Sequence, residues 1–162
     1  MVGIGRQVVD LAYGILTGPS GAPENLEVIG ESEGIAELRF RQIQVANVAP
    51  DVADKALGAQ YPSLQIYCEK LTNRMREKFR RFSGEANLRV DVRVSQDRLE
   101  GIEVQLQRCV DAVLRALEQH RGDWGDGAMY GGGYEVSFQG VKKGGRNFLQ
   151  MASVRFDVDV SK

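Results

Sequence analysis

The sequence predicts an α+β fold, in which helices cover one face of an antiparallel β-sheet. Three observations support this fold class. Residues 134–160 alternate between apolar and polar side chains, which is typical of two half-buried strands, and Gly144-Gly145 suits the turn between them. Residues 98–120 and 1–17 instead repeat apolar side chains at three and four positions, which predicts a long helix and an N-terminal helix. The 162 residues are sufficient for one domain with a substantial core.

The N-terminal part is predicted to hold one helix and an arm. Gly18-Pro19 ends the helix over 1–17, and its apolar stripe needs a cover on the same domain or on a neighbouring subunit. Residues 18–34 are rich in glycine and proline, which predicts a loop or arm. We therefore expect residues 1–34 to form an N-terminal helix and arm, and residues 35–162 to form a single α+β core domain.

The middle of the chain is predicted to supply three strands. Alternating apolar residues place them at 36–46, 64–68 and 88–94, and residues 50–57 are expected to form a short helix. The segment 70–82 fits both a strand with one basic face and a helix with an apolar stripe, so the period does not decide between them.

The helix over 98–120 has recognisable end signals. Asp97 is a candidate N-cap, Glu100 occupies the capping-box position, and Gly122 ends the helix. Gly101 inside the helix would cost about 1 kcal/mol relative to alanine, so we expect a close packing contact there. Residues 122–133 are predicted to be a glycine-rich loop between this helix and the final hairpin.

The register of the final hairpin predicts a β-bulge. With the turn at Gly144-Gly145, Val136 would lie opposite Ser153 and miss Val154. One extra residue near Ala152 would bring the two valines together.

The same register predicts a contact surface near the hairpin turn. It pairs Val141 with Phe148 on the otherwise polar face, where exposed paired hydrophobic residues would mark an interface and buried ones a packing contact within the domain. The candidate subunit interface comprises Val141, Lys142, Lys143, Arg146 and Phe148.

Composition and charge narrow the function classes. The net charge is −1, with 43% hydrophobic and 27% charged residues, which argues against a strongly basic nucleic-acid binder. No apolar run is long enough to cross a membrane, and no signal peptide is evident, so synthesis in the cytoplasm is the expectation.

No residue pattern predicts an enzyme, a cofactor or a metal site. His120 is the sole histidine and lies at a helix end, and Cys68 and Cys109 are far apart and lie in patterned elements. This set lacks both a zinc-ligand spacing and the geometry of a nucleophilic triad. The 122–133 segment also lacks the Lys-Ser/Thr pair of a phosphate-binding loop. We expect a non-enzymatic protein.

One charge cluster is a candidate contact surface for a lumen or a partner. Five cations fall close together in the ambiguous segment: Arg74, Arg76, Lys78, Arg80 and Arg81. Glu69, Glu77 and Glu85 could balance them as a solvated face. Alternatively, the cluster contacts a nucleic-acid backbone or an acidic partner subunit.

Three segments resemble the tail terminator and tail-completion proteins of long-tailed bacteriophages. They are "YPSLQIYCEK", "VRVSQDRLEGIEVQLQRCVDAVLRALEQHRGDW" and "GGYEVSFQGVKKGGRNFLQMASVRFDVDV", within residues 61–160. The resemblance lies in the ordered combination of a valine strand, a long helix, a following tryptophan and a final hairpin. None of these segments contains a catalytic motif.

This resemblance implies a structural virion protein in the tail or neck, made in the cytoplasm of the bacterial host. Such subunits form a hexameric ring that caps the tail tube and joins it to the head connector, with DNA passing through the lumen. The implied partners are further copies of the chain, the tail tube protein, connector or neck proteins, the sheath protein and, transiently, genomic DNA. The N-terminal part, residues 1–60, is longer than in compact terminators, which leaves a neck or sheath-contacting role as an alternative. A nucleic-acid-binding module using residues 74–81 is the alternative from another class.

Overall fold

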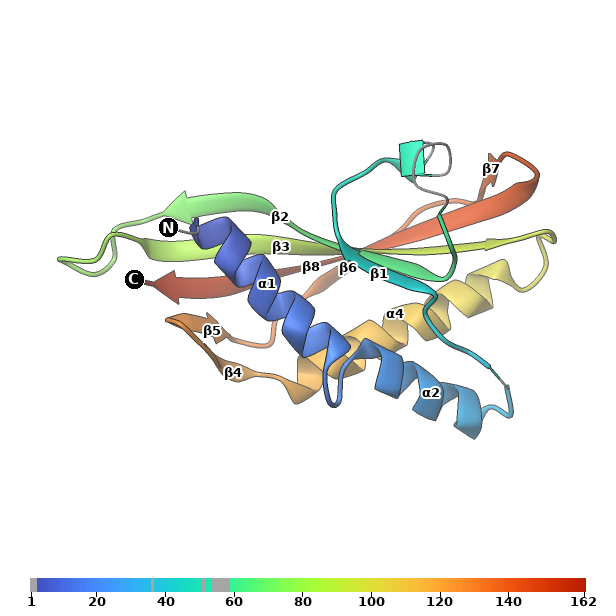
Figure 1. Cartoon of the computed structure of the whole chain (residues 1–162), viewed down its shortest axis with the longest axis horizontal. Helices are drawn as coiled ribbons and strands as arrows, with labels where there is room; N and C mark the ends of the chain where they lie inside the picture. Colours follow the sequence, from blue (N-terminus) through green and yellow to red (C-terminus); the bar gives the residue numbers. More distant parts are fainter. Residues whose placement is uncertain (1–2, 36, 51, 54–58) are drawn as a thin grey trace.

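A computed structural model describes residues 3–35, 37–50, 52–53 and 59–162. In these residues a mixed sheet of eight strands forms the centre of the protein, and its order is β1-β2-β3-β8-β5-β4, with β6 and β7 also paired to β8 (Figure 1). The strands are β1 Gln42–Val45, β2 Ser63–Asn73, β3 Ser83–Gln96, β4 Gly122–Gly125, β5 Ala128–Tyr130, β6 Glu135–Phe138, β7 Lys142–Gly144 and β8 Asn147–Ser161. The helices are α1 Ile4–Thr17, α2 Ala22–Ser32 and α4 Ile102–Gln119. The α+β class is confirmed, whereas the sheet is mixed because β1 runs parallel to β2.

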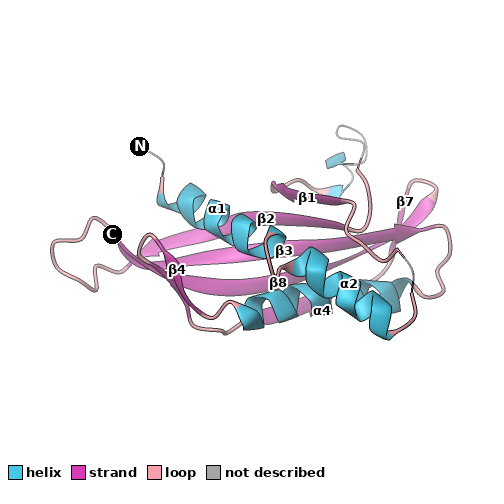
Figure 2. Cartoon of the chain, turned by 60° about the horizontal axis from the view of Figure 1, so that its bottom comes forward, coloured by secondary structure: helices cyan, strands magenta, loops and turns pink. Residues whose placement is uncertain are grey.

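Helices α1 and α4 cover one face of the sheet, and α2 packs beside α4 (Figure 2). The predicted N-terminal helix is confirmed. Val8, Val9, Ala12 and Leu16 of α1 are buried in the same core cluster as the central strands. The apolar stripe of α1 is therefore covered by its own chain.

The predicted loop or arm over 18–34 is wrong, because residues 22–32 form α2. Pro23 lies in the first turn, where a missing N–H is harmless to a helix. Gly30, in the last part of the helix, allows the following segment to pack closely, since a Cβ there would lie 3.1 Å from the Ile35 carbonyl oxygen and 3.2 Å from Leu38 Cβ. Leu26 and Ile29 are buried against the core. Pro23 and Gly30 are therefore both compatible with a packed helix, although proline and glycine in the sequence are typical of a loop.

Segments around the first strand are shorter than predicted. Only Gln42–Val45 of the expected 36–46 strand is extended, and residue 36 lies outside the described residues. Of the expected 50–57 helix, Pro50, Val52 and Ala53 are helical and the remainder lies outside the described residues.

Strands β2 and β3 form a long antiparallel pair that exceeds the predicted 64–68 and 88–94 strands. The ambiguous segment 70–82 is neither a helix nor a whole strand. β2 continues to Asn73, and residues 74–82, hereafter the β2–β3 tip, connect it to β3. The tip projects beyond one end of the sheet, at the left of Figure 1.

Helix α4 begins at Ile102, four residues later than predicted. Its N-cap is Gly101, with a φ of 82° and no side-chain cap hydrogen bond, so the predicted Asp97 cap and Glu100 capping box are wrong. No atom lies within 4 Å of a Cβ built on Gly101. Glycine is required there for its left-handed backbone, and the expected close packing is absent.

The expected 122–133 loop contains a hairpin. β4 and β5 pair antiparallel across Asp126 and Gly127, whose φ values of 51° and 78° are those of a tight two-residue turn. β5 then pairs with the end of β8. An Asp-Gly pair is a strong hairpin signal, but the surrounding glycines make the whole segment resemble a loop in the sequence.

Strand β8 runs without a register shift along β3, so the predicted bulge near Ala152 is wrong. Phe138 pairs with Ala152 and Lys142 with Leu149, and residues 139–141 therefore face only residues 150–151. The extra residue therefore lies in the first strand of the predicted hairpin, which is divided into β6 and β7. β8 stays regular because β3 holds its other edge throughout.

Two details of this pairing can be compared with the predicted register. Val136 does lie opposite Val154. Gly144 pairs with Asn147, however, so the turn residues are Gly145 and Arg146, one position later than predicted. Gly145 has a φ of 71°, which explains the need for glycine there.

Candidate functional site

The predicted basic cluster lies on the β2–β3 tip, and acidic side chains neutralise much of it. Arg74 Nη2 lies 2.6 Å from Glu85 Oε1, and Arg76 lies 3.6 Å from both Glu85 and Asp159. The hydrogen bond from Arg74 holds the pKa of Glu85 below its ordinary value. These pairs lie at the protein surface, with Glu85 half-buried, and contribute little stability, but they reduce the positive charge offered to a polyanion.

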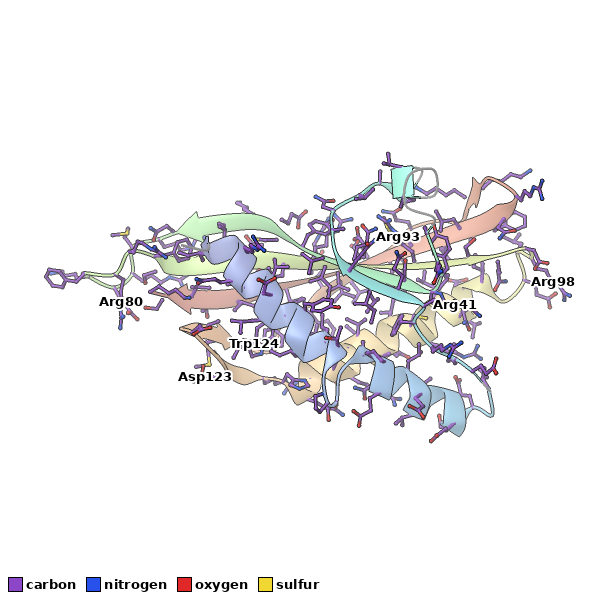
Figure 3. All side chains as sticks on the ribbon, in the orientation of Figure 1. Arg41, Arg80, Arg93, Arg98, Asp123 and Trp124 are labelled. Carbon is purple, nitrogen blue, oxygen red and sulfur yellow. The ribbon has the colours of Figure 1, made fainter. Side chains whose placement is uncertain are left out.

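Towards its end the tip is less neutralised. Arg80 Nε lies 3.3 Å from Glu77 Oε2, an acid that also accepts a hydrogen bond from Ser161. Lys78 is exposed and makes no ion pair with the described residues. Arg81 is also exposed. The structure thus brings all five cations to one end of the sheet, where Arg80 lies (Figure 3).

Side-chain hydrogen bonds hold the backbone of the tip. Asn73 Oδ1 accepts from the N–H groups of Met75 and Ser83, each at 3.1 Å, and Ser83 Oγ accepts from Glu77 N–H at 3.1 Å. Met75 and Phe79 adopt φ values of 51° and 66°, which are unusual for large side chains. Phe79 is fully exposed and Met75 is 59% exposed. The tip is an ordered projection that presents apolar side chains to solvent.

The predicted subunit interface lies around the β7–β8 turn, at the other end of β8. Lys142, Lys143 and Arg146 are exposed there. Val141 and Phe148 do not pair as predicted, because Phe148 lies opposite Lys143. Both hydrophobic side chains are half-buried against the core, which favours a packing contact within the domain. Only the cations of this set remain fully available to a partner.

A charge cluster that no sequence pattern predicts lies on the sheet face away from the helices. Asp91 Oδ1 lies 2.8 Å from Arg89 Nε and accepts a hydrogen bond from Ser153 Oγ at 2.9 Å. Arg93 Nη2 lies 3.8 Å from Asp91 Oδ2 and donates to the Val48 carbonyl. In the sequence these residues look like the exposed face of β3, but Asp91 and Arg93 are buried, and the Val48 carbonyl lies against Arg93. Arg93 lies near the middle of the sheet in Figure 3.

This charge cluster is an internally paired network. Tyr67 donates its hydroxyl hydrogen bond to Asp91, and burial together with that carboxylate raises the pKa of Tyr67 to about 12. Glu69 lies 3.6 Å from Arg89 and from Arg155, at the margin of an open groove of about 910 Å³. Such paired charges specify packing, because removing one member leaves another buried without compensation.

The histidine and the two cysteines, which are the residue types most often used in catalysis, lie partly or fully buried within the fold. His120 Nδ1 lies 2.7 Å from the Ala116 carbonyl, and its own carbonyl accepts a hydrogen bond from Trp124 Nε1. Burial raises the pKa of Cys109 to about 12 and also raises that of Cys68. Among the described residues, no three His, Cys, Asp or Glu side chains gather in a way that could hold a metal ion.

No protein-family model matches the sequence, and no match was found among the curated proteins. Within the described chain, none of the helices has the length and apolar character needed to cross a lipid bilayer.

Proposed function

We propose that this chain is a ring-forming tail terminator of a long-tailed bacteriophage, which caps the tail tube and joins it to the head connector. The observation that carries the proposal is the arrangement of the three segments that resemble this family. They supply β2, the end of β3 with α4 and β4, and the β6–β8 unit. In the sheet, β2, β3 and β8 are adjacent, and α4 packs on β3 and β8. The resembling segments therefore form one contiguous unit.

The shape of the molecule favours assembly between copies. A closed ring needs a head-to-tail interface made from two different surfaces on each subunit. The β2–β3 tip projects at one end of the sheet, and the cationic β7–β8 turn lies at the other (Figure 1). An ordered tip that exposes Met75 and Phe79 has the character of a contact surface.

The charge distribution is compatible with a lumen through which DNA slides. The chain carries a net charge of −1, and ion pairs engage Arg74, Arg76 and Arg80. Each phosphate contact would add salt-dependent affinity, so a partly neutralised surface lets DNA pass without being retained. The same pairs weigh against the alternative of a dedicated nucleic-acid-binding module.

Mass measurement in solution combined with electron microscopy of phage particles tests the proposal. We expect closed rings, and antibody label on the particle at the junction of tail and head. Particles that assemble complete, joined tails without this chain would refute the terminator role. Retention of a monomer on DNA at roughly 0.15–0.2 M salt would instead favour the nucleic-acid-binding module.

A further inference from the structure

The end of the β2–β3 tip combines an apolar projection with positive charge. Phe79 is fully exposed, and Lys78 and Arg80 flank it in the chain. Asn73 Oδ1 and Ser83 Oγ accept hydrogen bonds from the backbone N–H groups of Met75, Glu77 and Ser83, which hold the base of the tip. A surface held in one conformation before binding loses less conformational entropy when it docks, which favours its use as a recognition element.

A second surface, on α2, has the complementary character. A groove of about 960 Å³ runs along this helix, and Pro19, Pro23 and Ile35 contribute apolar parts of its lining. We call it the α2 groove. Glu24, Glu27 and Glu31 also line it and are exposed.

The α2 groove is predominantly acidic, because Glu37 adds a further carboxylate to its lining and Arg39 is the one cation among the described lining residues. Glu24, Glu27 and Glu31 make no ion pair with the described residues, and their spacing places them on one face of the helix. Like charges at this spacing disfavour a helix, and a cationic partner would relieve that repulsion. Charge and apolar character therefore match the end of the β2–β3 tip.

The two surfaces cannot meet within one molecule. The tip projects beyond the left end of the sheet in Figure 1, whereas α2 lies beside α4 at the lower right, away from the tip (Figures 1 and 2). We propose that the β2–β3 tip of one copy docks into the α2 groove of the next copy. Phe79 enters the apolar part of the groove, and Lys78 and Arg80 face Glu27 and Glu31. This assignment of the partner rests on the proposed ring-forming function and defines its head-to-tail contact.

Charge reversal on the full-length chain tests the contact. Two double variants are needed, Lys78→Glu with Arg80→Glu on the tip, and Glu27→Lys with Glu31→Lys on the groove. Sedimentation velocity should show that each variant alone associates at least about tenfold more weakly than wild type, because like charges now face each other. Mixed together, the two variants should recover association, since every tip then meets a groove of opposite charge.

Further variants separate the contact from a folding defect. Phe79→Ala should weaken association by about thirtyfold or more, as for a central aromatic anchor, with an unchanged circular dichroism spectrum. Lys142→Glu with Lys143→Glu reverses the same number of charges at the β7–β8 turn, which the sequence predicts as the subunit interface and which is therefore the competing contact. Association that survives this reversal but is lost in the tip reversal assigns the contact to the β2–β3 tip. Recovery on mixing cannot arise from two unfolded chains, so it is the decisive readout.

A wild-type chain that stays monomeric up to about 1 mM would overturn both this inference and the proposed ring. Mixed variants that associate no better than either variant alone would overturn the inference. Rings that are unaffected by the tip reversal, or that are lost through the Lys142 and Lys143 reversal instead, would overturn the inference and leave the proposed ring-forming function standing. Phe79-dependent binding to vesicles of phosphatidylserine and phosphatidylcholine without self-association would also overturn it, because the tip would then be a membrane contact.

Discussion

Replacement of Leu26 by alanine tests whether α2 belongs to the folded core. Leu26 is fully buried in the cluster that α1, α4 and the central strands share. The substitution removes three carbon groups from this cluster, which corresponds to about 2.4 kcal/mol of transfer free energy. Incomplete relaxation around the cavity adds to this loss, so we expect the free energy of unfolding to fall by about 3 kcal/mol.

Urea unfolding, monitored by circular dichroism, measures this change in the free energy of unfolding. For a chain of this size, the same loss lowers Tm by about 6–12 °C. Val28→Ala is the matched control, since Val28 is 50% exposed on the same helix. It should change stability by no more than about 0.5 kcal/mol.

Measurements at two protein concentrations separate folding from self-association, because association makes the unfolding midpoint depend on concentration. Equal effects of Leu26→Ala and Val28→Ala would refute the reasoning. That result would mean that α2 does not contribute its buried face to the monomer core, and that the segment behaves as the arm that the sequence alone predicts.

Three further predictions concern backbone geometry, buried charge and pH. Gly127→Ala should lower the free energy of unfolding by about 2–4 kcal/mol, because a Cβ at this position would clash with a backbone carbonyl. Gly125 also has a positive φ but faces open space, so Gly125→Ala should lower the free energy of unfolding by only about 1–2 kcal/mol. Equal losses for the two variants in urea unfolding would contradict the clash. Asp91→Ala should lower the free energy of unfolding by about 3–5 kcal/mol, because it removes the carboxylate that pairs with the buried Arg93 and the closer of the two carboxylates that pair with the half-buried Arg89. Asp10→Ala in an exposed pair should lower it by about 0.5 kcal/mol or less, and similar chemical-denaturation midpoints for the two variants would refute this. The Cys109 thiol has a pKa raised from 9.0 to about 12, so its contribution is fully present below pH 9 and is lost as pH rises towards 12. Stability should therefore fall less between about pH 8 and pH 10.5 in Cys109→Ala than in wild type, and identical slopes would count against a buried thiol.

Local patterns in the sequence were sufficient to predict the elements with regular periods. Val90, Val92 and Val94 alternate along β3, and Leu106, Val110 and Val113 repeat along α4. These patterns depend only on which side chains share a face, so they need no knowledge of the neighbouring elements. Element ends were less predictable, as Gly101 shows, because its left-handed backbone depends on how the chain approaches the helix.

The register and the burial of charged residues required the tertiary structure. β8 could not be assigned a register from its turn alone, because its continuous pairing with β3 moved the irregularity to residues 139–141. Arg93 and Asp91 follow the alternation of an exposed face, yet both are buried, with Arg93 donating to the Val48 carbonyl and Asp91 accepting from Tyr67 and Ser153 of neighbouring strands. Contacts of this kind join residues far apart in sequence, and a local period carries no information about them.

The sequence by itself determined the α+β class, the long helix and the basic character of residues 74–81. Only the tertiary structure decided that residues 22–32 are a packed helix and that the basic segment is an ordered projection with Phe79 exposed. It also decided that this projection and the α2 groove lie apart in one molecule. The physical reason is that local side-chain patterns set the elements, whereas the placement of their surfaces follows from packing between distant segments.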